Sequence, residues 1–142
     1  YYDHLLNLMN YSYDSFGNSS FMMLSRFSYL KRHFPRTLEL FEGNYYITLC
    51  ELLKSKVITL KKLKNLFDLE LAGEGRIDIV KSIESNLNLF VYNKDIETLE
   101  KDPRAFQAFI LALSGRGHQL GQTKKCPDWT NPESTNFIIP IF

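Results

Sequence analysis

Residues 102–117, DPRAFQAFILALSGRG, are the stretch that decides the fold class of this chain. Asp102 belongs to the residue types that cap a helix N-terminus, and Pro103 suits the first helical position because its missing N–H would have no partner there. Apolar side chains then recur at helical spacing, at Phe106, Phe109, Ile110 and Leu113. The pattern predicts a helix with one buried face that ends at Gly115 or Gly117.

Shorter segments with helical spacing lie on the N-terminal side of this stretch. The spacing predicts helices over residues 1–17, 21–34, 45–56, 58–68 and 76–86, and a short polar helix over 94–102. Residues 37–43 are expected to form one or two helical turns. Gly43 is expected to end one of them in a left-handed conformation, and Gly73 and Gly75 are expected to form a turn between two others. Residues 87–93, LNLFVYN, either extend a helix or form one short strand.

Together these segments predict a mainly α fold, a compact bundle of about six or seven short helices with an irregular Pro-rich C-terminal segment. We expect one domain, with residues 1–117 as its helical body and residues 118–142 as an irregular wrap packed on that body. Prolines, Pro140 among them, disfavour regular structure in the wrap. The apolar residues 136–142, NFIIPIF, are expected to dock as a terminal strap. The chain begins with Tyr rather than Met, which favours a fragment of a longer polypeptide.

The composition is that of an ordinary soluble globular chain. Of the 142 residues, 44% are apolar and 23% are charged, and the formal net charge is +1. This charge argues against a protein whose whole surface is directed at polyanions, although it leaves room for a local basic patch. The longest apolar runs fall short of the ~20 residues that span a membrane, and no signal peptide opens the chain.

Two cysteines, Cys50 and Cys126, are too few for a disulfide scaffold or a cysteine zinc site. Cys50 lies among apolar residues and is expected to be buried, whereas Cys126 follows two lysines in a polar stretch. Free thiols favour a reducing compartment, so we expect an intracellular location, cytoplasmic or nuclear. Whether the two thiols meet in a disulfide stays open.

A run of five lysines within KSKVITLKKLK is the first candidate binding site. Its members are Lys54, Lys56, Lys61, Lys62 and Lys64. Helices over 45–55 and 59–67, followed by a third helix near 76–86, would match a winged-helix-like arrangement in which these lysines meet nucleic-acid phosphates. The third helix mixes acidic and basic residues, and no clear two-stranded wing follows it. Solvated lysines on an amphipathic helix are therefore the competing interpretation.

Two short elements near the C-terminus resemble those of ββα-metal (His-Me) nucleases, namely GRGHQLG around His118 and TNFIIP around Asn136. The resemblance implies that His118 deprotonates water while Asn136 helps hold a divalent ion. The chain departs from that family because no Asp or Glu precedes Arg116, because a helix rather than a strand is predicted before His118, and because only six residues follow Asn136. The competing interpretation makes His118 a polar residue just beyond a helix C-terminus.

Other residues that could serve catalysis or cofactor binding lack the additional residues that such sites require. His4, His33 and His118 share no metal-ligand spacing, and LAGEGRID lacks the Lys-Ser/Thr pair of a phosphate loop. A nucleophilic Cys126 would need an oriented base, and His118 lies eight residues away in a segment with no fixed geometry. The sequence therefore favours a non-enzymatic chain with no metal or cofactor.

Aromatic residues are the most informative signal for function. The chain holds eleven Phe, eight Tyr and one Trp, and many tyrosines stand beside polar residues, as in YYDHLL, NYSYDSF, RFSYL, GNYY and LFVY. Tyr combines an apolar body with a polar tip, which suits partner surfaces, although large rings also fill gaps between short helices. We predict a non-catalytic protein–protein interaction or assembly module. Nucleic-acid binding and, behind it, metal-dependent nuclease activity are the alternatives.

Overall fold

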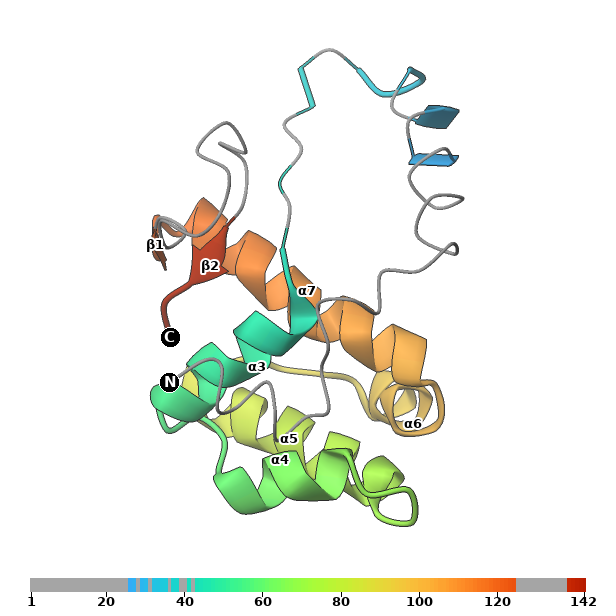
Figure 1. The fold of residues 1–142 in the computed structure, drawn as a ribbon, viewed down its shortest axis with the longest axis vertical. Helices are drawn as coiled ribbons and strands as arrows, with labels where there is room; N and C mark the ends of the chain where they lie inside the picture. Colours follow the sequence, from blue (N-terminus) through green and yellow to red (C-terminus); the bar gives the residue numbers. More distant parts are fainter. Residues whose placement is uncertain are drawn as a thin grey trace, which may run out of the picture. The chain divides into compact units, whose positions relative to one another are not determined.

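The computed structural model describes residues 26–27, 29–30, 32–35, 37–38, 41, 43–124 and 138–142 (Figure 1). Contacts within the chain separate two compact units, Asp3–Leu40 and Phe41–Phe142. Most of the described residues belong to the second unit. No helix among the described residues is both long enough and apolar enough to cross a membrane.

The described residues of the first unit outline the end of one helix. They are helical up to Leu30, and the backbone N–H of His33 donates to the Leu30 carbonyl at 2.9 Å. The turn lies directly before Pro35, whose ring disfavours helical geometry in the preceding residue. The helix expected over 21–34 is therefore present at its described residues up to Leu30, and residues 32–34 form a turn instead. The helix expected over 1–17 lies outside the described part of the chain.

The second unit contains five helices and a two-stranded ribbon among its described residues. They are α3 (Tyr45–Lys54), α4 (Leu60–Leu66), α5 (Ala72–Leu87), α6 (Asn93–Lys101), α7 (Pro103–Gln119), β1 (Thr123–Lys124) and β2 (Ile139–Pro140). The mainly α prediction is confirmed, but the described part of this unit holds five helices rather than six or seven. Of residues 87–93, Leu87 is the last residue of α5 and Asn93 the first of α6. Residues 88–92 neither extend α5 nor form a strand, because Asn88 takes a left-handed φ of 50° and ends the helix.

Three of the described helices, α3, α4 and α7, begin at a residue whose side chain caps them. The Asp102 carboxylate accepts a first-turn N–H of α7 at 2.8 Å, and Pro103 occupies the start of that helix. The Thr59 hydroxyl accepts a first-turn N–H of α4 at 3.4 Å. The Asn44 side chain accepts two N–H groups of α3, at 2.9 and 3.1 Å. Each cap satisfies backbone donors that have no partner inside the helix.

The central helix of this unit is α3, which is buried along most of its length. It contacts α4, α7 and β2, while α5 packs against α4 and α6, and α6 packs against α7 (Figure 1). Leu49, Cys50 and Leu52 of α3 are fully buried. The hydroxyls of Thr48 and Ser114 form a buried hydrogen bond of 2.9 Å between α3 and α7. Because these hydroxyls are paired, their burial carries little penalty.

The apolar stripes predicted for α5 and α7 supply much of the remaining core. The buried members are Ile79, Val80 and Ile83 of α5 and Phe106, Ile110 and Leu113 of α7. Phe109, the fourth predicted member of the α7 stripe, is only partly buried, so its expected burial holds only in part. Its ring instead lines a surface pocket.

Gly73 and Gly75 lie inside the first turns of α5, so the predicted turn between helices is wrong. Gly75 is buried at the crossing of α5 and α4. A Cβ at this position would lie 2.7 Å from the Leu66 nitrogen and 2.9 Å from the Asn65 carbonyl carbon, both backbone atoms of α4. The glycine is therefore required for the close approach of the two helices rather than for a turn.

We expect Gly75→Ala to destabilise the protein and Gly115→Ala to stabilise it. The added methyl at position 75 meets backbone that cannot rotate away, and such overpacking costs about 1–3 kcal/mol. Gly115 is an exposed helical position where a Cβ would meet nothing within 4 Å. There alanine should raise the free energy of unfolding by about 0.5–1 kcal/mol through its higher helix propensity. Urea denaturation followed by circular dichroism measures the free energy of unfolding of both variants. A change of the same sign in the two variants would contradict the roles given to these glycines.

Helix α7 continues through Gly115 and Gly117 to Gln119, so the prediction that one of these glycines ends it is wrong. Gly117 is buried, and a Cβ there would lie 3.1 Å from the Gln122 carbonyl oxygen and 3.4 Å from the Pro140 side chain. Because Gly117 has no side chain, β2 can pack closely against α7 at this position. Gly121 supplies the left-handed conformation after the helix, with φ of 68°.

The segment before α3 also differs from its prediction. The described residues among 37–43 are not helical, and Gly43 does not adopt a left-handed φ. Gly43 instead precedes Asn44, the cap of α3. A helix end was expected at the point where a helix begins.

Near the end of the sequence, a two-residue strand packs on the helical body. β1 and β2 pair antiparallel, with Thr123 opposite Pro140 and Lys124 opposite Ile139. β2 contacts both α3 and α7, and Ile139 is fully buried. The expected docking of the terminal strap therefore holds at Ile139 and Pro140, which are both buried. Pro140 does not prevent regular structure here, because an outer edge of a short ribbon needs no N–H from it.

An ion pair joins the ribbon to α3. The Lys124 ammonium lies 2.5 Å from a carboxylate oxygen of Glu51, whose side chain is almost fully buried. A buried carboxylate requires such a partner, so this contact ties the end of β1 to α3. The division of the chain into a body, 1–117, and a wrap, 118–142, stays a prediction.

Candidate functional site

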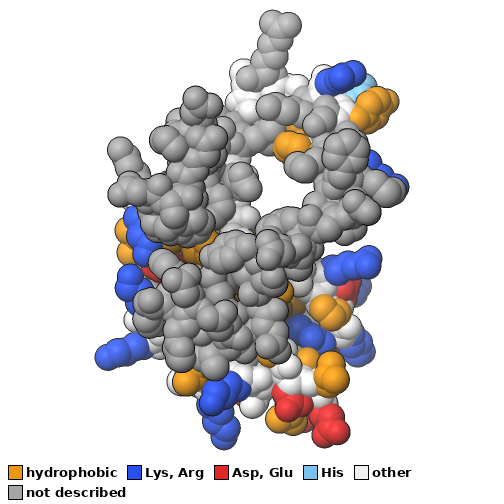
Figure 2. All heavy atoms as spheres, viewed as in Figure 1, with side chains coloured by type: hydrophobic (Ala, Val, Ile, Leu, Met, Phe, Trp, Pro, Cys, Tyr) orange, Lys and Arg blue, Asp and Glu red, His pale blue; other side chains and the backbone are white. Residues whose placement is uncertain are grey.

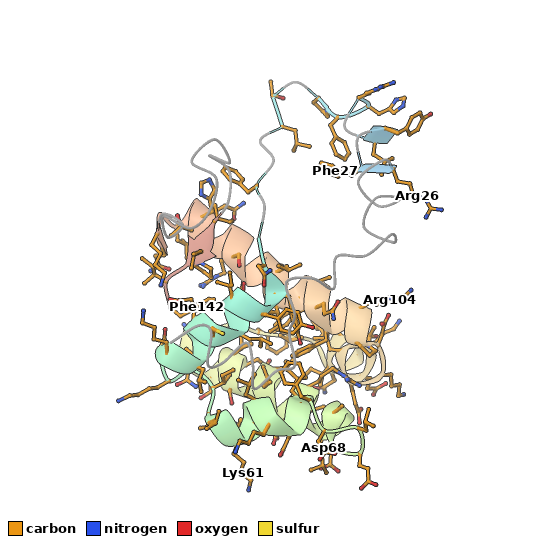
Figure 3. The ribbon with its side chains drawn as sticks, viewed as in Figure 1. Arg26, Phe27, Lys61, Asp68, Arg104 and Phe142 are labelled. Carbon is orange, nitrogen blue, oxygen red and sulfur yellow. The ribbon has the colours of Figure 1, made fainter. Side chains whose placement is uncertain are left out.

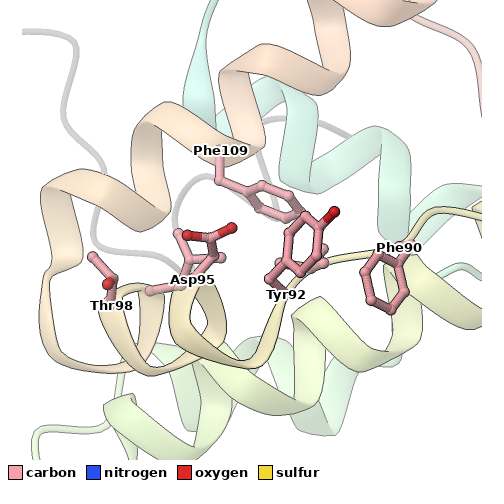
Figure 4. Close-up of a pocket in the computed structure, with 7 residues that line it drawn as sticks. Phe90, Tyr92, Asp95, Thr98 and Phe109 are labelled. Atoms are coloured by element: carbon pink, nitrogen blue, oxygen red, sulfur yellow. The ribbon is translucent and has the colours of Figure 1, made fainter.

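An open pocket of about 400 Å³ lies where the α5–α6 connection meets α6 and α7. Its lining residues are Phe90, Val91, Tyr92, Asp95, Thr98, Leu99 and Phe109. Figure 4 shows the labelled side chains arriving from three places, namely Phe90 and Tyr92 from the connection, Asp95 and Thr98 from α6, and Phe109 from α7. Most of the lining is therefore apolar or aromatic, with one carboxylate.

Two of the lining rings are exposed to solvent. Phe90 is 77% exposed and Tyr92 is 68% exposed, and the two rings meet edge to face with centroids 5.0 Å apart. Burying large rings is favourable, so leaving two of them beside a pocket is a feature that needs an explanation. Phe109 adds a third ring that is itself partly buried.

The backbone beneath these rings is held by hydrogen bonds. The Val91 N–H donates to a carboxylate oxygen of Glu84 at 2.8 Å, which ties the connection back to α5. The N–H groups of Asp95 and Ile96 donate to the Tyr92 carbonyl at 2.9 and 3.0 Å, which fixes the start of α6 directly after the rings. The pocket is thus built on anchored backbone.

Four of the five candidate lysines have exposed side chains, and the fifth, Lys62, forms hydrogen bonds within the protein. Lys54, Lys56, Lys61 and Lys64 are exposed. Figure 3 shows Lys61 projecting away from the helices, and Figure 2 shows Lys and Arg side chains spread around the helical body with acidic and apolar groups between them. Nucleic-acid binding by the lysines stays a prediction.

Lys62 has a structural role at the contact between α4 and α5. Its ammonium donates to the Ser82 hydroxyl at 2.5 Å and to the Asp78 carbonyl at 3.4 Å. The third helix of the winged-helix interpretation corresponds to α5, which contacts both α4 and α6. Its Arg76 guanidinium donates to the Glu100 carbonyl, so this cation links α5 to the end of α6.

His118 lies in the last turn of α7 rather than beyond the helix. It is partly buried, and its ring packs on Phe41 with centroids 4.0 Å apart. Asn136, the second residue of the nuclease hypothesis, lies outside the described residues. Within the part of the chain that the structure describes, no group of three or more His, Cys, Asp or Glu side chains could hold a metal ion.

Cys50 and Tyr45 are ionisable groups of the core whose protonated forms are favoured. Burial, with a smaller contribution from Glu51, raises the pKa of the Cys50 thiol to about 12. Burial is also the main cause that raises the pKa of Tyr45. The neighbouring Tyr46 raises this pKa further, whereas the positive charge of Arg76 lowers it. A thiol with such a pKa is a poor nucleophile at neutral pH. The expectation of a buried Cys50 is confirmed. Cys126 lies outside the described residues.

The sequence pattern identified part of this site. The aromatic stretch LFVY contributes Phe90, Val91 and Tyr92, whereas Asp95 and Phe109 were missed as site residues. In the sequence, Phe109 belongs to an apolar helical stripe and Asp95 is an acid in a first helical turn. Neither pattern by itself indicates a binding site. No protein-family model, no curated protein and no solved structure matches the chain.

Proposed function

We propose that this protein is a non-catalytic protein-binding module and that the pocket around Phe90 and Tyr92 is its binding surface. The single observation that carries the proposal is the pair of exposed rings beside an apolar pocket. Aromatic residues are enriched at partner surfaces, where they bury much area for few rotatable bonds. The hydrogen bonds under the rings support it, because a surface held in place before binding loses less entropy on association.

Selection of displayed random peptides on the whole chain tests the proposal. Peptides that bind the protein are expected to lose about tenfold or more in affinity for the double variant Phe90→Ser/Tyr92→Ser, since exposed aromatic anchors dominate such interfaces. Both positions are exposed, so the variant should keep its fold and its thermal stability. Leu69→Ser is the matched control, because Leu69 is fully exposed but does not line the pocket.

Two results would speak against the proposal. If selection yields no peptide whose binding depends on the rings, the pocket is not a protein-binding surface. If the chain instead binds labelled DNA or RNA with an affinity that falls steeply as salt is added, the lysine hypothesis is favoured. Mg²⁺-dependent cleavage that is lost in His118→Ala would favour the nuclease hypothesis.

A further inference from the structure

We infer that the pocket recognises an arginine side chain of the partner polypeptide, through the carboxylate of Asp95 and the faces of the surrounding rings. This inference rests on the proposed function and specifies the group that the pocket takes. Its basis is the juxtaposition of one carboxylate with three aromatic rings in a single open pocket.

Among the residues that the structure describes, Asp95 is the only charged one that lines the pocket. Among the described residues, the one ion pair joins Lys124 and Glu51, so no described Lys or Arg neutralises Asp95. Its position in the first turn of α6 suits the positive end of the helix dipole, which gives the carboxylate a structural role as well. That role leaves its oxygens able to accept hydrogen bonds from a cationic ligand.

The rings favour a weakly hydrated cation over a neutral apolar group. In the view of Figure 4, Tyr92 and Phe109 lie on the same side of Asp95, and Phe90 lies beyond Tyr92. A cation over an aromatic face is attracted by the negative potential of the ring. A purely aliphatic ligand would leave the Asp95 carboxylate facing apolar surface, which is unfavourable.

Between the two cationic side chains, arginine fits this arrangement better. Its planar guanidinium donates two parallel hydrogen bonds to a carboxylate and stacks on aromatic faces at the same time. The lysine ammonium is more strongly hydrated and binds as a point charge. An open pocket with a single carboxylate and several ring faces therefore selects the guanidinium.

The experiment uses peptides that bind the whole chain in a way that depends on Phe90 and Tyr92. These peptides are expected to be enriched in arginine, and replacing that arginine with citrulline, a neutral isostere, should weaken binding about tenfold or more, as for the loss of a charged hydrogen bond. Asp95→Asn should weaken binding of the arginine peptide by a similar factor. The citrulline peptide should bind the wild type and Asp95→Asn equally. Thr98→Ala, a lining position without charge, is the control and should change binding little.

The outcomes separate this inference from the function on which it rests. If replacing arginine with citrulline weakens binding equally in the wild type and in Asp95→Asn, the inference is overturned. The peptide arginine and the Asp95 carboxylate would then contribute to affinity independently. Ring-dependent peptides without a cation, or with no response to Asp95→Asn, would also overturn it while leaving the protein-binding function standing. Ring-dependent peptides that prefer lysine to arginine would contradict the choice of guanidinium. If no peptide binds in a way that depends on Phe90 and Tyr92, both the arginine inference and the proposed protein-binding function are wrong.

Discussion

Phe106→Ala is expected to lower the free energy of unfolding by about 3–5 kcal/mol, the usual cost of removing a buried phenylalanine. The ring is 1% exposed and lies on the face of α7 that contacts α3. It meets the ring of Tyr45 edge to face with centroids 6.3 Å apart, at the start of α3. Truncation would leave a cavity between the two helices, and the surrounding backbone could close it only in part.

Urea denaturation of Phe106→Ala beside Phe109→Ala measures this effect. Phe109 occupies the same helix but is only partly buried, so its truncation should cost clearly less. If Phe106→Ala does not fold, Phe106→Leu should fold with a smaller loss, because it keeps more of the side-chain volume. Equal costs at positions 106 and 109 would show that the core is placed wrongly.

Ile139→Ala is expected to cost about 2–5 kcal/mol, although it lies three residues from the end of the sequence. The side chain is fully buried, and β2 contacts both α3 and α7. The isoleucine therefore belongs to the core of the helical body. A terminal residue that did not dock would contribute almost nothing to stability.

Ile141→Ala is the matched control for this substitution. Ile141 directly follows β2 but is 48% exposed, so its truncation should stay within about 1 kcal/mol of the wild type. Its backbone N–H donates to the Gln122 carbonyl at 2.9 Å, and alanine keeps that hydrogen bond. An unchanged melting temperature for Ile139→Ala would mean that the strap does not stabilise the body.

Much of the helical architecture follows from local features of the sequence. Asp102 and Thr59 cap the helices that they were expected to cap, and Pro35 lies directly after a turn. The stripes of α5 and α7 are buried at most of the predicted positions. These features are predictable because capping and helical spacing depend on residues a few positions apart, which the chain itself places together.

The roles of the glycines were not predictable in the same way. Gly75 and Gly117 were read as breaks because glycine commonly ends helices, yet both lie within helices. What distinguishes them is a neighbour from elsewhere in the chain, the α4 backbone for Gly75 and Pro140 for Gly117. A single sequence does not show which backbone will approach.

By itself, the sequence determined that this protein is mainly helical, where several helices begin and which faces carry apolar residues, because each of these depends on short-range geometry. Only the tertiary structure decided that Gly75 and Gly117 mark helix contacts, that the terminal residues form a buried strand, and that Asp95 and Phe109 share a pocket with Tyr92. The physical reason is that close packing and pocket formation depend on distances between segments that are remote in sequence.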